Sequence, residues 1–165
     1  MPEKWVSFLK KELRGLERLL VLGTGNALKA DDAAGLLVAS LLERRLSRRQ
    51  KSRIKILRAY ELIDSYHRRI KRLKPSHLII IDAVDLGHRP GSIMVTRLEP
   101  GQKKEKVGGE FYLLLEKLAA ESSCRIYLVG IQPDSLDFGH PITPGVKEAC
   151  RKVAEGLIQL AGGGR

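Results

Sequence analysis

The sequence has few cysteines, few aromatic residues and no long apolar run. Its two cysteines, Cys124 and Cys150, are too few for a disulfide framework and are not spaced as a metal-binding pair, so we expect ordinary buried thiols. No apolar run approaches the roughly 20 residues that a membrane-spanning helix needs. Residues 1–19 carry charges throughout and lack the apolar core of a secretory signal. We therefore expect a cytoplasmic protein that does not enter a membrane.

The chain of 165 residues is 43% hydrophobic and 30% charged, which is typical of a single globular domain. We expect one domain over residues 1–165, with a helical extension over residues 1–17. The net charge of +11 comes mostly from residues 43–55 and 66–74. No zinc finger or RNA-binding signature accompanies these segments, so we expect a solvated face that could steer an acidic protein, and no specific nucleic-acid partner.

Strand and helix patterns alternate along the chain. Strand patterns cover residues 18–25, 53–59, 77–85, 91–98 and 124–133, and helical patterns cover residues 5–16, 33–46, 62–74, 109–122 and 143–161. The last helix has Thr143 as a candidate N-cap and Pro144 in its first turn. His67, in a basic helix, and His77, at the start of a strand, are expected at the surface. The alternation predicts an α/β fold, a three-layer αβα sandwich around a mostly parallel sheet of about five strands.

Three loops that follow strands carry more acids, amides and glycines than a tight connection needs. They cover residues 23–32, 82–91 and 130–141. Ligand sites of such sheets lie outside the carboxyl ends of the strands, because loops and helix N-termini converge there. We therefore expect these three loops to meet and to form the functional edge of the sheet.

The first loop begins like a nucleotide-binding turn. Gly23 and Gly25 permit a close approach of the backbone or a positive φ, and Asn26 can fix the turn through its side chain. Leu28, however, stands where a dinucleotide-binding fingerprint needs its third glycine, and two aspartates follow that would repel a pyrophosphate. The sequence therefore disfavours phosphate binding at this loop.

The aspartates fit a different chemistry. Asp82 ends an apolar strand, where a buried carboxylate is costly unless it is paired, hydrogen-bonded or bound to a cation. Asp32 and Asp82, brought together at the strand ends, would form a candidate site for a divalent metal, although a hydrogen bond to the first loop would also satisfy Asp82. Asp31 is placed to cap the helix that follows, a role worth about 0.5–2 kcal/mol. The alternative role of Asp32 is a charge in the first turn of that helix, where it complements the helix dipole.

Three motifs carry a resemblance to a known family. VLGTGNALKADDAAG at residues 21–35, LIIIDAVDLGHRPGSI at 78–93 and LVGIQPDSLDFGHPITPGVKEA at 128–149 resemble, in this order, the maturation endopeptidases of nickel-iron hydrogenases. The resemblance covers residues 19–160. It implies a peptidase that removes the C-terminal extension of a hydrogenase large-subunit precursor after nickel insertion. The nickel would belong to the precursor and serve as the recognition element, and no organic cofactor is implied.

The resemblance also implies site residues. Asp32 and Asp82 would be the catalytic and metal-contacting acids. The residues implied for substrate binding are Gly23, Gly25, Asn26, Asp31, Gly87 and Gly91.

The expected third metal ligand departs from the family pattern. The family has a histidine in a Ser/Thr-Thr-His loop before a leucine-rich helix, whereas this chain has Val107 or a nearby glycine there. His88 and His140, both on the predicted functional edge, are candidate substitutes. Glu110 could supply a carboxylate at the start of its helix, where capping is the alternative role.

Two other interpretations remain open. The first is a non-catalytic protein of the same fold that recognises a metal-loaded partner, which the departure at the third ligand favours. The second is an α/β protein that binds nucleotides or nucleic acid, which the positive charge and the glycine loop favour and the aspartates oppose.

Overall fold

The five strands form one sheet in the computed structural model, which describes residues 2–60, 63–102 and 109–162. The strands are β1 (Leu19–Thr24), β2 (Ile54–Ala59), β3 (His77–Ala83), β4 (Ile93–Leu98) and β5 (Arg125–Ile131). Their order is β2-β1-β3-β5-β4, with β4 antiparallel to β5 and all other neighbours parallel. The expected mostly parallel sheet is confirmed.

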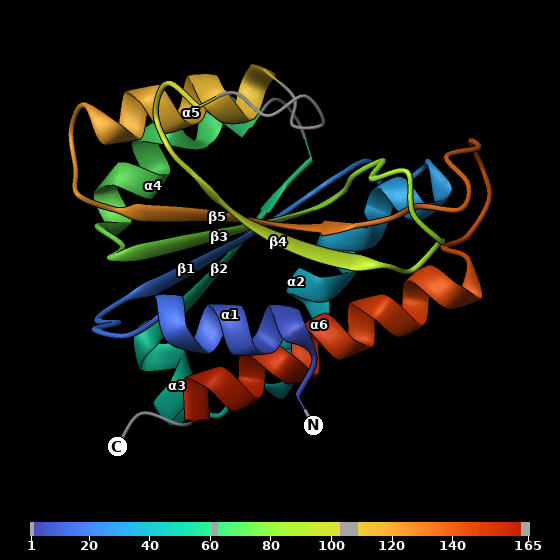
Figure 1. The fold of residues 1–165 in the computed structure, drawn as a ribbon, viewed down its shortest axis with the longest axis horizontal. Helices are drawn as coiled ribbons and strands as arrows, with labels where there is room; N and C mark the ends of the chain where they lie inside the picture. The colour runs from blue at the N-terminus through green and yellow to red at the C-terminus, as the bar shows by residue number, and fades with distance from the viewer. Residues whose placement is uncertain (1, 61–62, 103–108, 163–165) are drawn as a thin grey trace.

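Helices cover both faces of the sheet. They are α1 (Lys4–Glu12), α2 (Ala34–Arg45), α3 (Arg48–Arg53), α4 (His67–Leu73), α5 (Gly109–Ala119) and α6 (Pro144–Gly162), with short 3-10 helices η1 (Ala30–Ala33) and η2 (Ile63–Tyr66). Figure 1 shows α4 and α5 on one face and α1, α2, α3 and α6 on the other, which confirms the three layers. Within the described part of the chain, no helix is long and apolar enough to cross a membrane.

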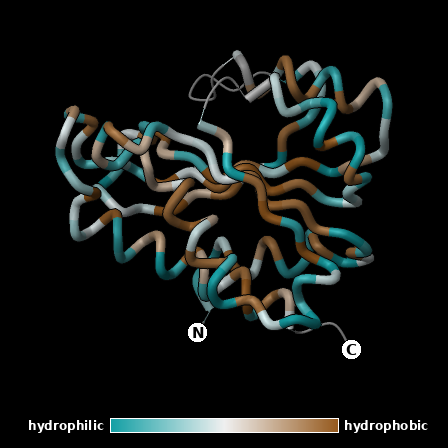
Figure 2. Tube along the Cα trace, turned by 180° about the vertical axis from the view of Figure 1, so that it is seen from behind, coloured by the Kyte–Doolittle hydropathy of each residue, from teal (hydrophilic) through white to brown (hydrophobic). Residues whose placement is uncertain are grey.

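The continuous apolar runs of the central strands follow from this layering. Successive side chains of a strand point to opposite faces, so a strand covered on both faces is apolar at every position. In β3, for example, Ile79 and Ile81 pack with α2 and α6, whereas Leu78 and Ile80 pack with α4 and α5. Figure 2 shows the hydrophobic residues concentrated along the strands between the helices.

One helix was missing from the sequence-based prediction. The helix α3 begins after Ser47, whose Oγ accepts a hydrogen bond from Gln50 N at 3.2 Å, while Gln50 Oε1 accepts one from Ser47 N at 2.9 Å. This reciprocal pair is a capping box, and its sequence signature, serine followed by glutamine three residues later, is present in the chain. The helix has only six residues and no buried face, so hydrophobic periodicity could not reveal it.

Two expectations about polar and thiol side chains need correction. His77 is buried, not at the surface, and its ring stacks on Tyr127 with centroids 6.4 Å apart. Burial of this imidazole, with the nearby Arg125 guanidinium, lowers its pKa. Cys150 is fully buried as expected, but Cys124 is only half-buried.

Candidate active site

The loops that follow β1, β3 and β5 leave the same edge of the sheet. These strands are parallel neighbours, with Gly23 aligned with Ile81 and Asp82 aligned with Gly130, so their carboxyl ends coincide. In Figure 1 this edge lies on the right, where the loops lead into α2 and α6. The three predicted loops therefore converge, as expected for a ligand site in a parallel sheet.

The glycine turn after β1 closes around Asp32. Gly25 has φ +146°, and a Cβ on it would lie 1.8 Å from the carbonyl oxygen of Asp32, so only glycine fits there. Asn26 N donates to Asp32 Oδ2 at 3.1 Å, and Asn26 Oδ1 accepts from Leu28 N at 2.9 Å. The half-buried Asp32 carboxylate is thus held by the turn itself.

Asp82 approaches the same region from the centre of the sheet. It is the penultimate residue of β3, it is half-buried, and its Oδ1 accepts a hydrogen bond from Ala83 N at 2.9 Å. Asp32 lies in η1, which contacts β3 directly. The contact is close because the second residue of α2 is Gly35, where a Cβ would lie 2.1 Å from the carbonyl oxygen of Ile81. Asp32 and Asp82 therefore come from packed neighbouring segments.

Asp31 does not cap the following helix, so that expectation is wrong. The chain first forms the 3-10 turn η1, and no side chain caps either η1 or α2. The Asp31 side chain is 0% exposed and accepts hydrogen bonds from the backbone N–H groups of Asp134 (2.8 Å), Ser135 (3.0 Å) and Thr143 (2.7 Å). The Thr143 hydroxyl donates to both carboxylate oxygens, at 3.0 and 2.9 Å. Asp31 therefore clamps the loop between β5 and α6 onto the first loop.

These contacts also fix the ionisation of Asp31. Burial alone would raise its pKa, but the backbone N–H groups of Ser135, Thr143 and Asp134, together with the Thr143 hydroxyl, outweigh burial and hold the pKa below the ordinary 3.8. The carboxylate is thus ionised at neutral pH although no basic side chain of the described residues bonds to it. Thr143 occupies the expected N-cap position of α6, and its carbonyl oxygen accepts a hydrogen bond from Lys147 N. Its hydroxyl, however, donates to Asp31 and not to the helix.

Gln132 is a buried positioning residue that sequence reasoning missed. Its Oε1 accepts hydrogen bonds from the backbone N–H groups of Leu86 (2.6 Å) and His88 (3.3 Å), and its Nε2 donates to Asp85 Oδ1 at 3.2 Å. Gln132 therefore ties the loop after β3 to the end of β5. The available signal was an amide directly after an apolar strand, on a loop already predicted to be functional.

The other candidate residues lie at the margins of this edge. Gly87 and Gly91 have φ +66° and +82°, which turn the loop after β3. His88 and His140 are exposed. Among the described residues, no group of three His, Cys, Asp or Glu side chains could hold a metal ion, so neither histidine completes a site with Asp32 and Asp82. Val107 and the side chain of Glu110 lie outside the described residues.

Comparison with known proteins identifies the family. The family model described as hydrogenase maturation protease matches residues 37–160, which is most of the chain. The chain belongs to the hydrogenase maturation protease family. The inferred resemblance is confirmed, and with it the assignment to a peptidase class.

Individual relatives agree along nearly the full length. The chain is 31% identical to the hydrogenase 2 maturation protease of Escherichia coli, over 86% of this chain and 88% of that protein. It is 28% identical to the hydrogenase 3 maturation protease of the same organism, over 88% and 92%.

Solved structures show the same fold. The nickel-iron hydrogenase maturation protease HycI of Thermococcus kodakarensis superimposes with a TM-score of 0.82 at 24% identity, covering 94% of this chain and 99% of that one. The hydrogenase maturating endopeptidase HybD of E. coli gives a TM-score of 0.66 at 28% identity, covering 85% and 89%.

Proposed function

We propose that this protein removes the C-terminal extension of a nickel-iron hydrogenase large-subunit precursor and uses the nickel bound in that precursor for recognition. The observation that carries the proposal is the position of Asp32 and Asp82, two half-buried carboxylates on packed segments at the edge where three loops converge. Family membership supplies the reaction class. The metal is part of the substrate, so the chain needs to contribute only some of its ligands.

Each carboxylate has a defined part in this proposal. Asn26 N–H holds Oδ2 of Asp32, so we assign Oδ1 of Asp32 to the metal. Asp82 supplies a second hard oxygen ligand from the end of β3. By binding the metal, the two aspartates would orient the adjoining peptide bond at the edge where the first loop and the loop after β3 meet. The precursor's metal, once held by these residues, would supply Lewis-acid activation of a water at the scissile carbonyl.

The test is processing of a purified, nickel-loaded large-subunit precursor, followed by mass spectrometry of the product. The wild-type protein should shorten this precursor and leave the nickel-free form intact. Asp32→Asn and Asp82→Asn should each lower the processing rate by at least about a hundredfold with the fold unchanged, because each replaces a metal-binding oxygen with an amide of the same shape. Glu116→Gln, at an exposed acid on α5 and away from the strand ends, is the control and should process normally.

Three results would contradict the proposal. Cleavage of the nickel-free precursor at the same rate would remove the metal from recognition. Normal processing by Asp32→Asn would remove Asp32 from the reaction. Binding of the nickel-loaded precursor without any cleavage by the wild-type protein would favour the non-catalytic interpretation instead.

A further inference from the structure

Most of the exposed large hydrophobic side chains gather at the edge of the candidate active site. Six such residues occur among the described residues, and four follow carboxyl ends of parallel strands: Leu28 (67% exposed), Tyr60 (56%), Leu136 (45%) and Phe138 (66%). Scattered exposed apolar residues need no explanation, but a group on one edge marks an interaction surface.

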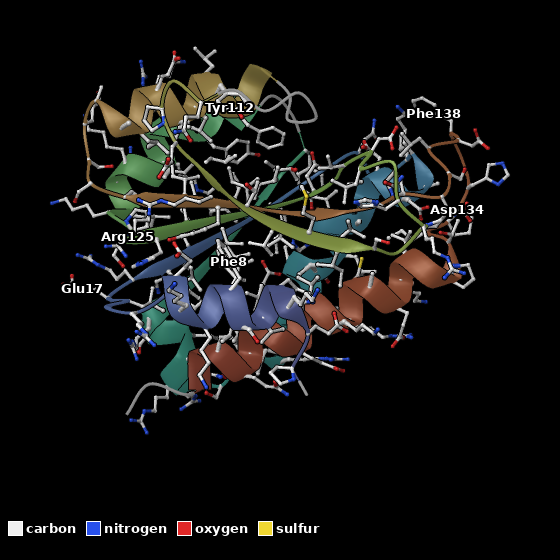
Figure 3. The ribbon with its side chains drawn as sticks, in the orientation of Figure 1. Phe8, Glu17, Tyr112, Arg125, Asp134 and Phe138 are labelled. Carbon is white, nitrogen blue, oxygen red and sulfur yellow. The ribbon has the colours of Figure 1, made fainter. Side chains whose placement is uncertain are left out.

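Three of the four lie on two loops that are joined to each other. We call Leu28, Leu136 and Phe138 the apolar rim. Gly139 N donates a hydrogen bond to the carbonyl oxygen of Leu28 at 2.9 Å, and Lys29 Nζ lies 5.6 Å from the centroid of the Phe138 ring. Figure 3 shows Phe138 on the outside of the loop between β5 and α6.

Hydrogen bonds to Asp31 hold the loop that carries Leu136 and Phe138 in place. Asp31, three residues from Leu28, binds the backbone at both ends of the segment that carries Leu136 and Phe138, through Ser135 N and Thr143 N. Because the loop is already ordered, it loses little conformational entropy when a partner binds, and this favours affinity. The fold therefore holds these apolar side chains in water at a fixed position, although doing so does not stabilise the isolated chain.

We infer that the apolar rim is the docking surface for the folded body of the protein substrate, separate from the residues that hold its metal. The inference rests on the proposed function. The rim adjoins Asp32 through the first loop, where Asn26 bonds to both Asp32 and Leu28, so a protein whose chain terminus reaches Asp32 comes close to the rim. The surface around the rim is polar, with exposed Asp134 and Asp137 on the same loop, as at the edge of a protein interface. The partner surface that fits is an apolar patch of a folded protein next to its cleavable tail.

The experiment compares Leu28→Ser and Phe138→Ser with Leu113→Ser. Leu113 is 46% exposed but lies on α5, away from the strand ends, so it controls for removing an exposed apolar side chain. Binding of each variant to immobilised nickel-loaded precursor is measured together with its rate of processing. We expect each rim variant to bind at least about tenfold more weakly and to show a raised KM with kcat nearly unchanged, as for a binding hot spot outside the reacting centre. Leu113→Ser should match the wild type, and all melting temperatures should agree closely.

The outcomes separate this inference from the proposed function. If the wild type processes the precursor and both rim variants bind it as the wild type does, the docking surface is wrong and the function stands. If the wild type binds the precursor without cutting it and the rim variants bind weakly, the inference stands and the function fails. A wild-type dimer that dissociates in both rim variants, seen by light scattering, would assign the rim to a second copy of the chain and overturn the inference.

Discussion

Replacing Asp31 should destabilise the protein far more than the loss of a helix cap. Its carboxylate accepts hydrogen bonds from three backbone N–H groups and one hydroxyl, all on a segment more than 100 residues away. At about 1.5 kcal/mol each, the lower end for hydrogen bonds to a charged group, the three backbone bonds sum to about 4–5 kcal/mol. Water can reach some of the freed N–H groups, because Asp134 is exposed. We therefore expect Asp31→Ala to lower the free energy of unfolding by about 3 kcal/mol or more, and Asp31→Asn by less, because the amide keeps one acceptor oxygen.

The assay is urea-induced unfolding at pH 7, with hydrogen exchange of the Ser135 and Thr143 amides as a local probe. Both amides should lose protection in Asp31→Ala, because they lose their acceptor. Asp137→Asn, an exposed acid on the same loop, should change stability by no more than about 0.5 kcal/mol. If Asp31→Ala lowers the free energy of unfolding by less than about 1 kcal/mol, as the loss of a simple helix cap would, then Asp31 does not hold the loop between β5 and α6 against the first loop.

The pH dependence of stability gives an independent check on Asp31. Its pKa in the folded state is lowered from the ordinary 3.8, so its contribution to stability is fully present above that ordinary value and is lost as the pH falls through the folded-state pKa. The wild type should therefore lose stability below about pH 4 more steeply than Asp31→Asn, which has no carboxylate to titrate there. Parallel curves for the two proteins would contradict the assignment.

Three further predictions concern packing, thiol reactivity and charge. Gly35→Ala should cost about 3 kcal/mol or more, because its Cβ would lie 2.1 Å from the carbonyl oxygen of Ile81. Gly145→Ala, whose Cβ would meet no atom of the described residues within 4 Å, should be neutral or stabilise by up to about 1 kcal/mol, and similar urea midpoints for the two variants would show that α2 does not pack closely against β3 at Gly35. Burial raises the pKa of Cys150 to about 12, so iodoacetamide at neutral pH should label it only after unfolding, and its stoichiometric labelling in the folded protein, seen by mass spectrometry, would disprove its burial. Random duplex DNA should bind weakly through the basic segments 43–55 and 66–74 and be released at about 0.2 M salt in a gel-shift assay. Tight, sequence-selective binding at that salt would favour the nucleic-acid interpretation instead.

The layer architecture was readable from the sequence because it depends on local pattern. Continuous apolar runs such as that of β3 require cover on both faces, and amphipathic segments between them supply the covering helices. The same pattern located the edge where the three loops meet, because loops that follow neighbouring parallel strands leave the sheet on the same side. Asp32 and Asp82 were singled out for the same reason, and their catalytic role remains a prediction.

The sequence by itself therefore determined the alternation of strands and helices, the edge that carries the loops, and the family motifs. Only the tertiary structure decided what Asp31 and Gln132 do, because their partners are distant in the chain: Asp31 binds Thr143, 112 residues away, and Gln132 binds Leu86, 46 residues away. A carboxylate before a helix has the same local sequence whether it caps that helix or clamps another loop. The choice depends on which backbone N–H groups the folded sheet brings within reach, and it favours those that would otherwise be left without a partner.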